Sequence, residues 1–176
     1  MSTVIGSGRQ EIWDTLTAPD RRTRWGPLSF LSLDDSGPYP APGHPVRWRC
    51  RLGRIPVELR ETPLVVSPSE QFRAALALGG LRLEQTFTLS PEPGRNPATR
   101  LHVKLVAPNR APVVGGLMDR FLVRELVTDL AGGVLEAVQE ALEAADRRAG
   151  QRLSRPPPRR SPGRSGAAPR DRRAEC

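Results

Sequence analysis

Hydrophobic and polar residues alternate in two neighbouring stretches of the chain, and each stretch folds back at a glycine. In residues 45–52, apolar side chains occupy positions 46, 48, 50 and 52, with arginines between them. After Gly53-Arg54, apolar residues return at positions 55, 57 and 59. A two-residue turn with glycine first is typical of a type II′ hairpin. The alternation therefore predicts an antiparallel hairpin with one apolar face.

The pairing across each turn supports this prediction, because partners in a hairpin must share a face. Folding about Gly53-Arg54 pairs apolar with apolar residues and Arg49 with Glu58. A second hairpin turns at Gly79-Gly80. The expected apolar-face pairs are Leu52 with Ile55, Cys50 with Val57, Trp48 with Leu59, Leu78 with Leu81, Leu76 with Leu83, Ala74 with Gln85 and Phe72 with Phe87. The two hairpins predict a sheet whose apolar face must be covered.

The segments around the hairpins predict further strands, short helices and loops. We expect strands at residues 1–5, 28–33 and 100–106, short helices at 10–16 and about 18–25, and loops at 62–69 and 90–99.

A long helix is expected near the C-terminus. Residues 113–148 are helical in composition, but their apolar stripe changes face near residue 123. We therefore predict a flap or helical turn at 113–123 and a main helix at 124–147. Gly132-Gly133 costs this helix about 1 kcal/mol per glycine relative to alanine. A close approach to the sheet, or a kink, would explain the two glycines.

Charge divides the chain into two parts. Residues 147–176 hold ten arginines against Asp171 and Glu175, a net charge of +8. Residues 1–146, with 17 basic and 17 acidic groups, are therefore neutral. From residue 149 onward the chain is rich in Arg and Pro, which predicts a disordered basic tail at 149–176. The overall charge is thus no sign that the folded part binds nucleic acid.

Cysteine use and hydropathy favour a reduced, cytoplasmic protein. Cys50 faces the apolar side of its strand and Cys176 ends the tail, so a disulfide between them has little support. No signal peptide or membrane-spanning run is visible. His44 and His102 have no cluster of further ligands beside them, and no phosphate loop or dinucleotide motif occurs. We expect no metal and no cofactor.

Three local motifs accompany this order of elements. They are residues 10–20 (QEIWDTLTAPD) followed by Trp25, the pair Gly37-Pro38 and Pro42-Gly43 before an alternating strand, and residues 89–93 (LSPEP). Over residues 1–148 the chain resembles the START and polyketide cyclase/dehydrase-like (SRPBCC) superfamily. The resemblance implies an α+β helix-grip fold. A curved antiparallel sheet of six to seven strands would wrap a long C-terminal helix, with two short helices after the first strand.

The resemblance also implies an elongated apolar cavity and a class of function. Members of the superfamily bind lipids, sterols, polyketides, plant hormones or quinones, and a minority are cyclases or dehydratases. The leading hypothesis is binding or transport of a small apolar ligand, such as a lipid, polyketide or isoprenoid. Two alternatives stay open: a polyketide cyclase/dehydratase-type enzyme, and an interaction protein whose basic tail contacts nucleic acid or an anionic membrane surface.

The candidate cavity residues are those on the inner face together with the expected flap. They are Trp48, Leu59, Glu61, Phe72, Leu76, Leu83, Gln85, Phe87, Val103, Met118 and Phe121. The apolar residues among them could equally well belong to an ordinary hydrophobic core without contacting a ligand. Gln85 needs a partner, which a helix backbone group, a buried water or a ligand could supply.

Three further positions have a structural interpretation and a chemical one. Glu61 lies near the expected strand end, which favours a solvated carboxylate at the rim over a general acid or base. Cys50 lies in an apolar setting that raises its pKa and makes it inert. The outward row Arg47, Arg49 and Arg51 is most simply a solvated, charge-paired surface. We predict no catalytic residue, because few inward groups titrate.

Overall fold

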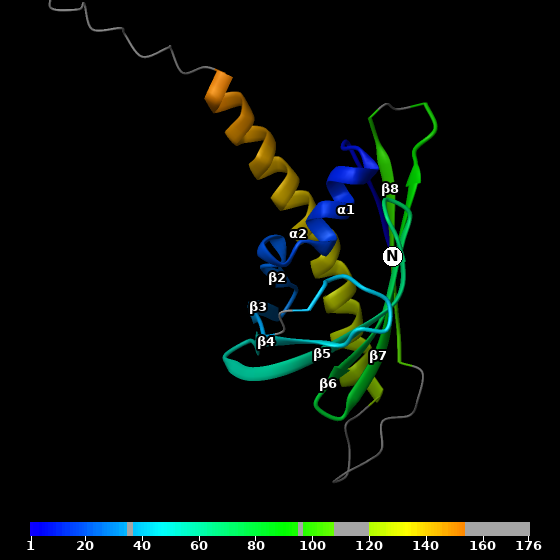
Figure 1. The fold of residues 1–176 in the computed structure, drawn as a ribbon, viewed down its shortest axis with the longest axis vertical. Coiled ribbons are helices and arrows are strands. Elements are labelled where there is room, and N and C mark those ends of the chain that lie inside the picture. The colour runs from blue at the N-terminus through cyan, green and yellow to red at the C-terminus, as the bar shows by residue number, and fades with distance from the viewer. Residues whose placement is uncertain (35–36, 95–96, 108–119, 154–176) are drawn as a thin grey trace, which may run out of the picture.

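The computed structural model describes residues 1–34, 37–94, 97–107 and 120–153, in which a curved antiparallel sheet lies against a long helix (Figure 1). The strands are β1 (Ser2–Ile5), β2 (Arg24–Trp25), β3 (Leu28–Leu33), β4 (Val46–Leu52), β5 (Ile55–Ser67), β6 (Gln71–Leu78), β7 (Leu81–Pro91) and β8 (Thr99–Val106). The helices are α1 (Arg9–Thr17), a short 3-10 turn η1 (Pro19–Arg21) and α2 (Arg120–Leu153). The sheet order is β1-β8-β7-β6-β5-β4-β3-β2, so chain neighbours are mostly sheet neighbours.

Both hairpins have the register that the alternation predicts. In the first, Trp48 lies opposite Leu59 and Arg49 opposite Glu58. In the second, Phe72 lies opposite Phe87 and Ala74 opposite Gln85. Gly53 and Gly79 begin the turns with φ of +60° and +56°. A side chain would be strained at that φ, so glycine is required at the first turn position.

The sheet is larger than expected, with eight strands in the described part instead of six to seven. The expected helix at 18–25 is wrong beyond its first turn: η1 ends at Arg21, and Arg24–Trp25 pairs with β3. The expected loop at 62–69 is also wrong, because β5 continues to Ser67. A bulge between Pro63 and Val65 shifts the register there, which lets a strand accommodate a proline.

The long helix differs from its expected limits. It is continuous from Arg120, so the boundary expected at 123/124 is absent, and it extends to Leu153, into the expected tail. Residues 113–119 and 154–176 lie outside the described residues. The helix buries one stripe against the sheet: Leu130, Ala131, Val134, Val138 and Leu142. Among the described residues, no helix has the length and hydrophobicity needed to cross a membrane.

A glycine contact brings α2 against the turn between β2 and β3. A Cβ at Gly133 would lie 1.8 Å from the backbone nitrogen of Gly26, and a Cβ at Gly26 would lie 2.4 Å from the carbonyl oxygen of Asp129. Gly26 also has φ of +52°. Backbone therefore packs on backbone here, which confirms the expected close approach for Gly133. A Cβ at Gly132, by contrast, would meet no atom of another element within 4 Å.

We predict opposite effects for alanine at the two glycines. Gly133→Ala should lower the free energy of unfolding by about 2 kcal/mol, because the methyl group must push the helix off the turn. Gly132→Ala should leave it unchanged or raise it by up to about 1 kcal/mol, since it improves helix propensity without a clash. Urea unfolding measures both. Equal destabilisation by the two substitutions would contradict the backbone contact.

Candidate functional site

The apolar residues that the alternation along each strand places on the inner face are buried there. Their exposed fractions are Trp48 1%, Leu59 3%, Phe72 0%, Leu76 5%, Leu83 4%, Phe87 1% and Val103 0%. Burial of this kind fits core and cavity wall alike, so ligand contact stays a prediction for each of them. Met118 lies outside the described residues. Phe121 belongs to α2, but its side chain is not described.

The interior of the described part is almost filled. Between the sheet and α2 lies a pocket of about 20 Å³ with an entirely apolar lining: Trp25, Leu28, Leu59, Leu76, Leu78, Leu83, Leu105, Leu130 and Val134. This is room for about one water molecule, and an apolar space of that size stays dry. Three candidate residues, Leu59, Leu76 and Leu83, line it.

A wider apolar opening lies next to this pocket, where the two hairpins diverge. Pairing of β5 with β6 begins at Leu59 and Leu78, so residues 55–58 project past the end of β6. The hollow measures about 660 Å³ and shares Leu78 with the interior pocket. We call it the apolar opening; its lining residues are Leu52, Val57, Glu58, Arg60, Ala77, Leu78, Gly79, Leu81, Arg82 and Leu126.

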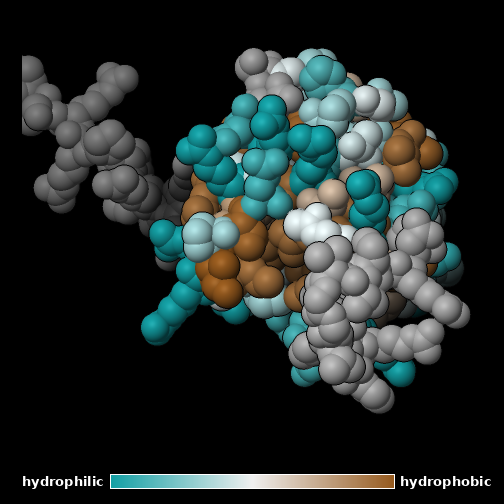
Figure 2. All heavy atoms as spheres, turned by 90° about the horizontal axis from the view of Figure 1, so that it is seen from below, coloured by the Kyte–Doolittle hydropathy of each residue, from teal (hydrophilic) through white to brown (hydrophobic). Residues whose placement is uncertain are grey.

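Hydrophobic residues gather at this end of the molecule. Figure 2 views the structure from below Figure 1, the end at which the β6–β7 hairpin turns, and shows a hydrophobic area bordered by hydrophilic residues. Leu52, Val57, Leu78 and Leu126 of the opening are only partly buried. Part of their apolar surface therefore stays exposed at the opening.

A larger hollow, of about 850 Å³, lies between α1 and α2 and is charged. Its lining includes the carboxylates of Glu11, Asp14, Asp20, Glu136 and Glu140. It shares no lining residue with the interior pocket, whereas the smaller apolar opening does, so the smaller opening is the candidate site. In the described part, no group of three or more His, Cys, Asp or Glu side chains could hold a metal ion.

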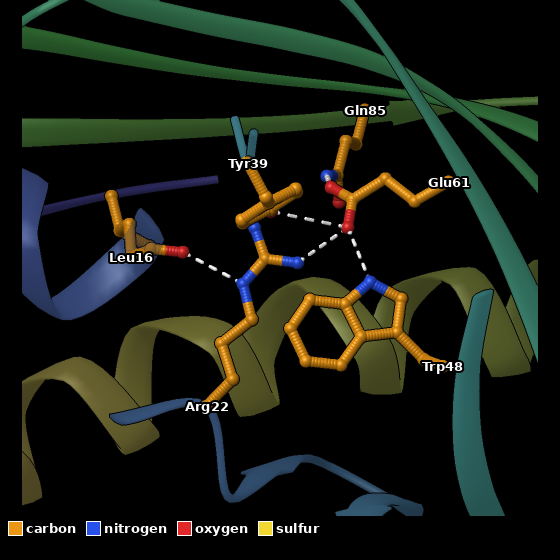
Figure 3. A network of polar contacts seen from close by, with 6 residues as sticks. All are labelled: Leu16, Arg22, Tyr39, Trp48, Glu61 and Gln85. Atoms are coloured by element: carbon orange, nitrogen blue, oxygen red, sulfur yellow. Dashed lines mark hydrogen bonds and ion pairs between the residues drawn. The ribbon is translucent and has the colours of Figure 1, made fainter. Parts of the chain in front are cut away.

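Five polar side chains meet in the interior on the concave side of the sheet (Figure 3). Glu61 of β5 is at their centre. Its Oε2 accepts hydrogen bonds from Arg22 Nη1 at 2.7 Å, Trp48 Nε1 at 2.7 Å and the Tyr39 hydroxyl at 3.2 Å, and its Oε1 accepts one from Gln85 Nε2 at 2.9 Å. We call these five residues the polar cluster.

The position of Glu61 corrects the expectation of a solvated rim carboxylate. Its exposed fraction is 0%. Because β5 runs on to Ser67, Glu61 lies in mid-strand and not at a strand end. A buried carboxylate is costly unless it is paired and hydrogen-bonded. The guanidinium of Arg22 and three uncharged donors meet that requirement.

Arg22 is enclosed by aromatic rings and by the helix that precedes it. Its Nε donates to the carbonyl oxygen of Leu16 at 2.7 Å, at the end of α1. Its guanidinium carbon lies 4.6 Å from the ring centre of Trp25 and 5.2 Å from that of Trp48, within reach of cation–π attraction. Burial lowers the pKa of Arg22, but the charge and hydrogen bond of Glu61, together with Tyr39 and Cys50, outweigh this effect, so the pKa is raised.

Gln85 finds a partner that the sequence did not identify: the carboxylate of Glu61. Its Oε1 has no hydrogen-bond partner in the described structure, and neither has Nη2 of Arg22. An acceptor and a donor are therefore left over in the same buried cluster. Buried waters usually satisfy polar groups of this kind.

Tyr39 of the polar cluster stays protonated at neutral pH. Burial raises the pKa of the Tyr39 phenol well above its ordinary value, and Arg22 opposes this only in part, so Tyr39 keeps the proton that it donates to Glu61. Burial also raises the pKa of Cys50 to about 12. That value confirms an unreactive thiol at neutral pH.

The exposed charges of the sheet are paired in part. Arg49 bonds Asp34, whereas Arg47 and Arg51 of the same row have no hydrogen bond or ion pair within the described part. His102 is exposed, as the alternation along its strand predicts.

Sequence reasoning missed Arg22, Tyr39 and Trp25. Arg22 belongs to the polar run Arg21-Arg22-Thr23-Arg24, which is typical of an exposed segment. Tyr39 is the only tyrosine and lies in a proline-rich loop. One feature of the sequence pointed to such a residue. The alternation places both Glu61 and Gln85 on the inner face, and a buried carboxylate requires a cation from elsewhere in the chain.

Comparison with known proteins identifies the fold. No protein-family model matches the sequence, and no curated protein matches it at a significant level. Three solved structures illustrate the matches. A protein from Nitrosomonas europaea has a TM-score of 0.61 at 15% identity, covering 82% of this chain and 93% of its own. A START superfamily protein from Mycobacterium smegmatis has a TM-score of 0.52 at 18% identity, covering 85% of this chain and 96% of its own.

The third is DynU16, a protein from the dynemicin biosynthetic locus, with a TM-score of 0.57 at 19% identity. The match covers 82% of this chain but only 46% of DynU16. At such identities these likenesses show the fold alone. The chain has the START-like helix-grip fold: one open antiparallel sheet and a long C-terminal helix, as the resemblance implies.

We predict that the buried ion pair is strongly coupled. Glu61→Leu or Arg22→Met should each lower the free energy of unfolding by about 3–5 kcal/mol, because each leaves an unpaired buried charge or its partners unsatisfied. The double variant should lose much less than the sum of the two. Urea unfolding of the four proteins gives the coupling energy directly.

The surface pair of Arg73 and Glu84 provides the control, because its N···O distance is also 2.7 Å while its side chains are 44% and 34% exposed. Glu84→Leu should cost about 1 kcal/mol or less. If a buried single variant fails to fold, Tyr39→Phe removes one donor to Glu61 and should cost about 1 kcal/mol. Equal costs for Glu61→Leu and Glu84→Leu would contradict the cluster's role.

Proposed function

We propose that this START-like domain binds a small apolar ligand at the apolar opening, with the interior pocket as the inner end of the site. The observation that supports the proposal is that the two hollows are adjacent and share a lining residue. Leu78 lines both the opening of about 660 Å³ and the apolar interior pocket. A volume of this size suits a small organic ligand.

The lining gives such a ligand a source of affinity. The half-buried side chains of Leu52, Val57, Leu78 and Leu126 would lose water contact beneath it. Burial of apolar surface contributes roughly 25 cal/mol per Å². The solved START superfamily structure supports a ligand-binding class for this fold. Lipid, polyketide and isoprenoid-like molecules all meet the chemical requirement.

The polar cluster supports binding over catalysis as the main role. A cyclase or dehydratase would need a titratable group at the ligand. Glu61 and Gln85, the candidates for that role, line neither the opening nor the interior pocket of the described part. The carboxylate of Glu61 is occupied by four donors. The basic tail, as a further contact with nucleic acid or an anionic membrane surface, stays a prediction.

The experiment is a titration of the full chain with Nile red, an uncharged dye whose emission rises in apolar sites. Wild-type protein should bind it, and dodecanol should displace it. Leu126→Gln should weaken binding about tenfold, since a half-buried apolar contact at the opening is replaced by an amide.

Leu31→Gln is the matched control, because Leu31 is 57% exposed and does not line the opening. It should bind the dye as the wild type does, with both variants checked by circular dichroism. Absence of dye binding by the wild type, or an equal loss in both variants, would rule out this site.

A further inference from the structure

Two arginines stand at the rim of the apolar opening. Arg60 of β5 and Arg82 of β7 both line it, and both are exposed. Each lies directly opposite Ala77 of β6 in the sheet register. Residues in register point to the same face of a sheet, so the two arginines flank Ala77 on the outer face, the face of Arg47. Val57 and Leu78 belong to the inner face. The opening lies at the end of the paired region and is lined by residues of both faces.

This spacing suits one shared anion. Neighbouring strands lie about 4.8 Å apart, which puts the Cα atoms of Arg60 and Arg82 about 10 Å from each other. Both side chains are long, and the methyl group of Ala77 between them fills little space. Two guanidinium groups can therefore converge on a carboxylate or phosphate above Ala77, a group that guanidinium recognises with paired hydrogen bonds.

Within the described residues, no acidic side chain pairs with these two arginines. Three other arginines on the sheet are paired, Arg49 with Asp34, Arg73 with Glu84 and Arg100 with Glu92, whereas Arg47 and Arg51 have no such partner in the part of the chain that the structure describes. Within the described residues, neither Arg60 nor Arg82 has a hydrogen bond or an ion pair.

The balance of charge near the opening is positive. Its lining holds Arg60 and Arg82 against one carboxylate, Glu58, which lies opposite Arg49. Arg47 lies opposite Arg60 and adds a further positive charge nearby. An anion placed between the two rim arginines would relieve their mutual repulsion.

We propose that the ligand is an amphipathic anion, whose apolar body occupies the opening and whose carboxylate or phosphate head lies between Arg60 and Arg82. The inference rests on the proposed function and adds a head group to it. The same chemistry is offered by a free fatty acid-like molecule and by a lipid head group in a bilayer. The half-buried leucines at the opening would hold the body, and the arginines would select the head.

Three twelve-carbon probes that differ only in their head separate the two parts of the site. Dodecanoate, dodecanol and dodecyltrimethylammonium compete with Nile red for the full-length protein, below their micelle-forming concentrations. Wild-type protein should bind dodecanoate about five- to tenfold more tightly than dodecanol, as expected of exposed charge pairs. The cationic probe should bind most weakly. The preference for dodecanoate should fall as salt is added.

The variant Arg60→Gln/Arg82→Gln should lose the preference for dodecanoate and keep the affinity for dodecanol. Arg51→Gln is the control, because Arg51 is exposed on the same face and does not line the opening. It should retain the wild-type preference.

The outcomes distinguish this inference from the proposed function. Equal binding of all three probes would overturn the anion inference and leave apolar binding intact. Absence of binding by any probe would overturn both. If free dodecanoate fails to bind but phosphatidylglycerol vesicles do, and the double variant abolishes this, the head group is that of a membrane lipid.

Discussion

The interior of this domain depends on the buried ion pair between Arg22 and Glu61. Both side chains are almost fully excluded from solvent, at 1% and 0% exposure. Neither charge would be tolerated there alone. Glu61 gathers donors from β4, β7, the loop before β4 and the segment after η1 onto one carboxylate. Segments distant in sequence are thereby held at one point of the sheet.

The ion pair and the glycine contact together decide where the domain is closed and where it is open. The polar cluster and its surrounding aromatic rings fill the middle of the concave face. The contact of Gly26 with Gly133 draws α2 against the β2–β3 turn, which leaves an interior pocket of about 20 Å³. Space is left where the hairpins diverge past Leu59 and Leu78. An apolar molecule therefore displaces the least protein structure when it binds at that end.

The sequence predicted correctly those features that depend on residues close together in the chain. Both hairpin registers follow from alternation about Gly53 and Gly79, and the role of Gly133 follows from the cost of glycine in a helix. The continuation of β5 through Pro63 was missed, because a bulge depends on the neighbouring strand. The start of α2 was missed because its apolar stripe changes face near residue 123. Its end was missed because the helix continues to Leu153, into a segment whose composition predicts disorder.

The candidate site was predictable only in part. The alternation along the strands placed Glu61 and Gln85 on the inner face but could not reveal the hydrogen bond between them. Arg22 was hidden because nothing in a run of polar residues marks the one that turns inward. The apolar opening arises from the divergence of two hairpins, a tertiary property that no single segment encodes.

An apolar ligand is expected to contact the opening and to leave the polar cluster undisturbed. Two-dimensional ¹H–¹⁵N spectra of the full chain, recorded with and without dodecanol, test it most directly. We expect shifts of the backbone amides of Gly79 and Leu126 and of the indole N–H of Trp25, which lines the interior pocket. The indole N–H of Trp48, bonded to Glu61, should not move. Movement of the Trp48 signal with Gly79 and Leu126 unchanged would contradict it.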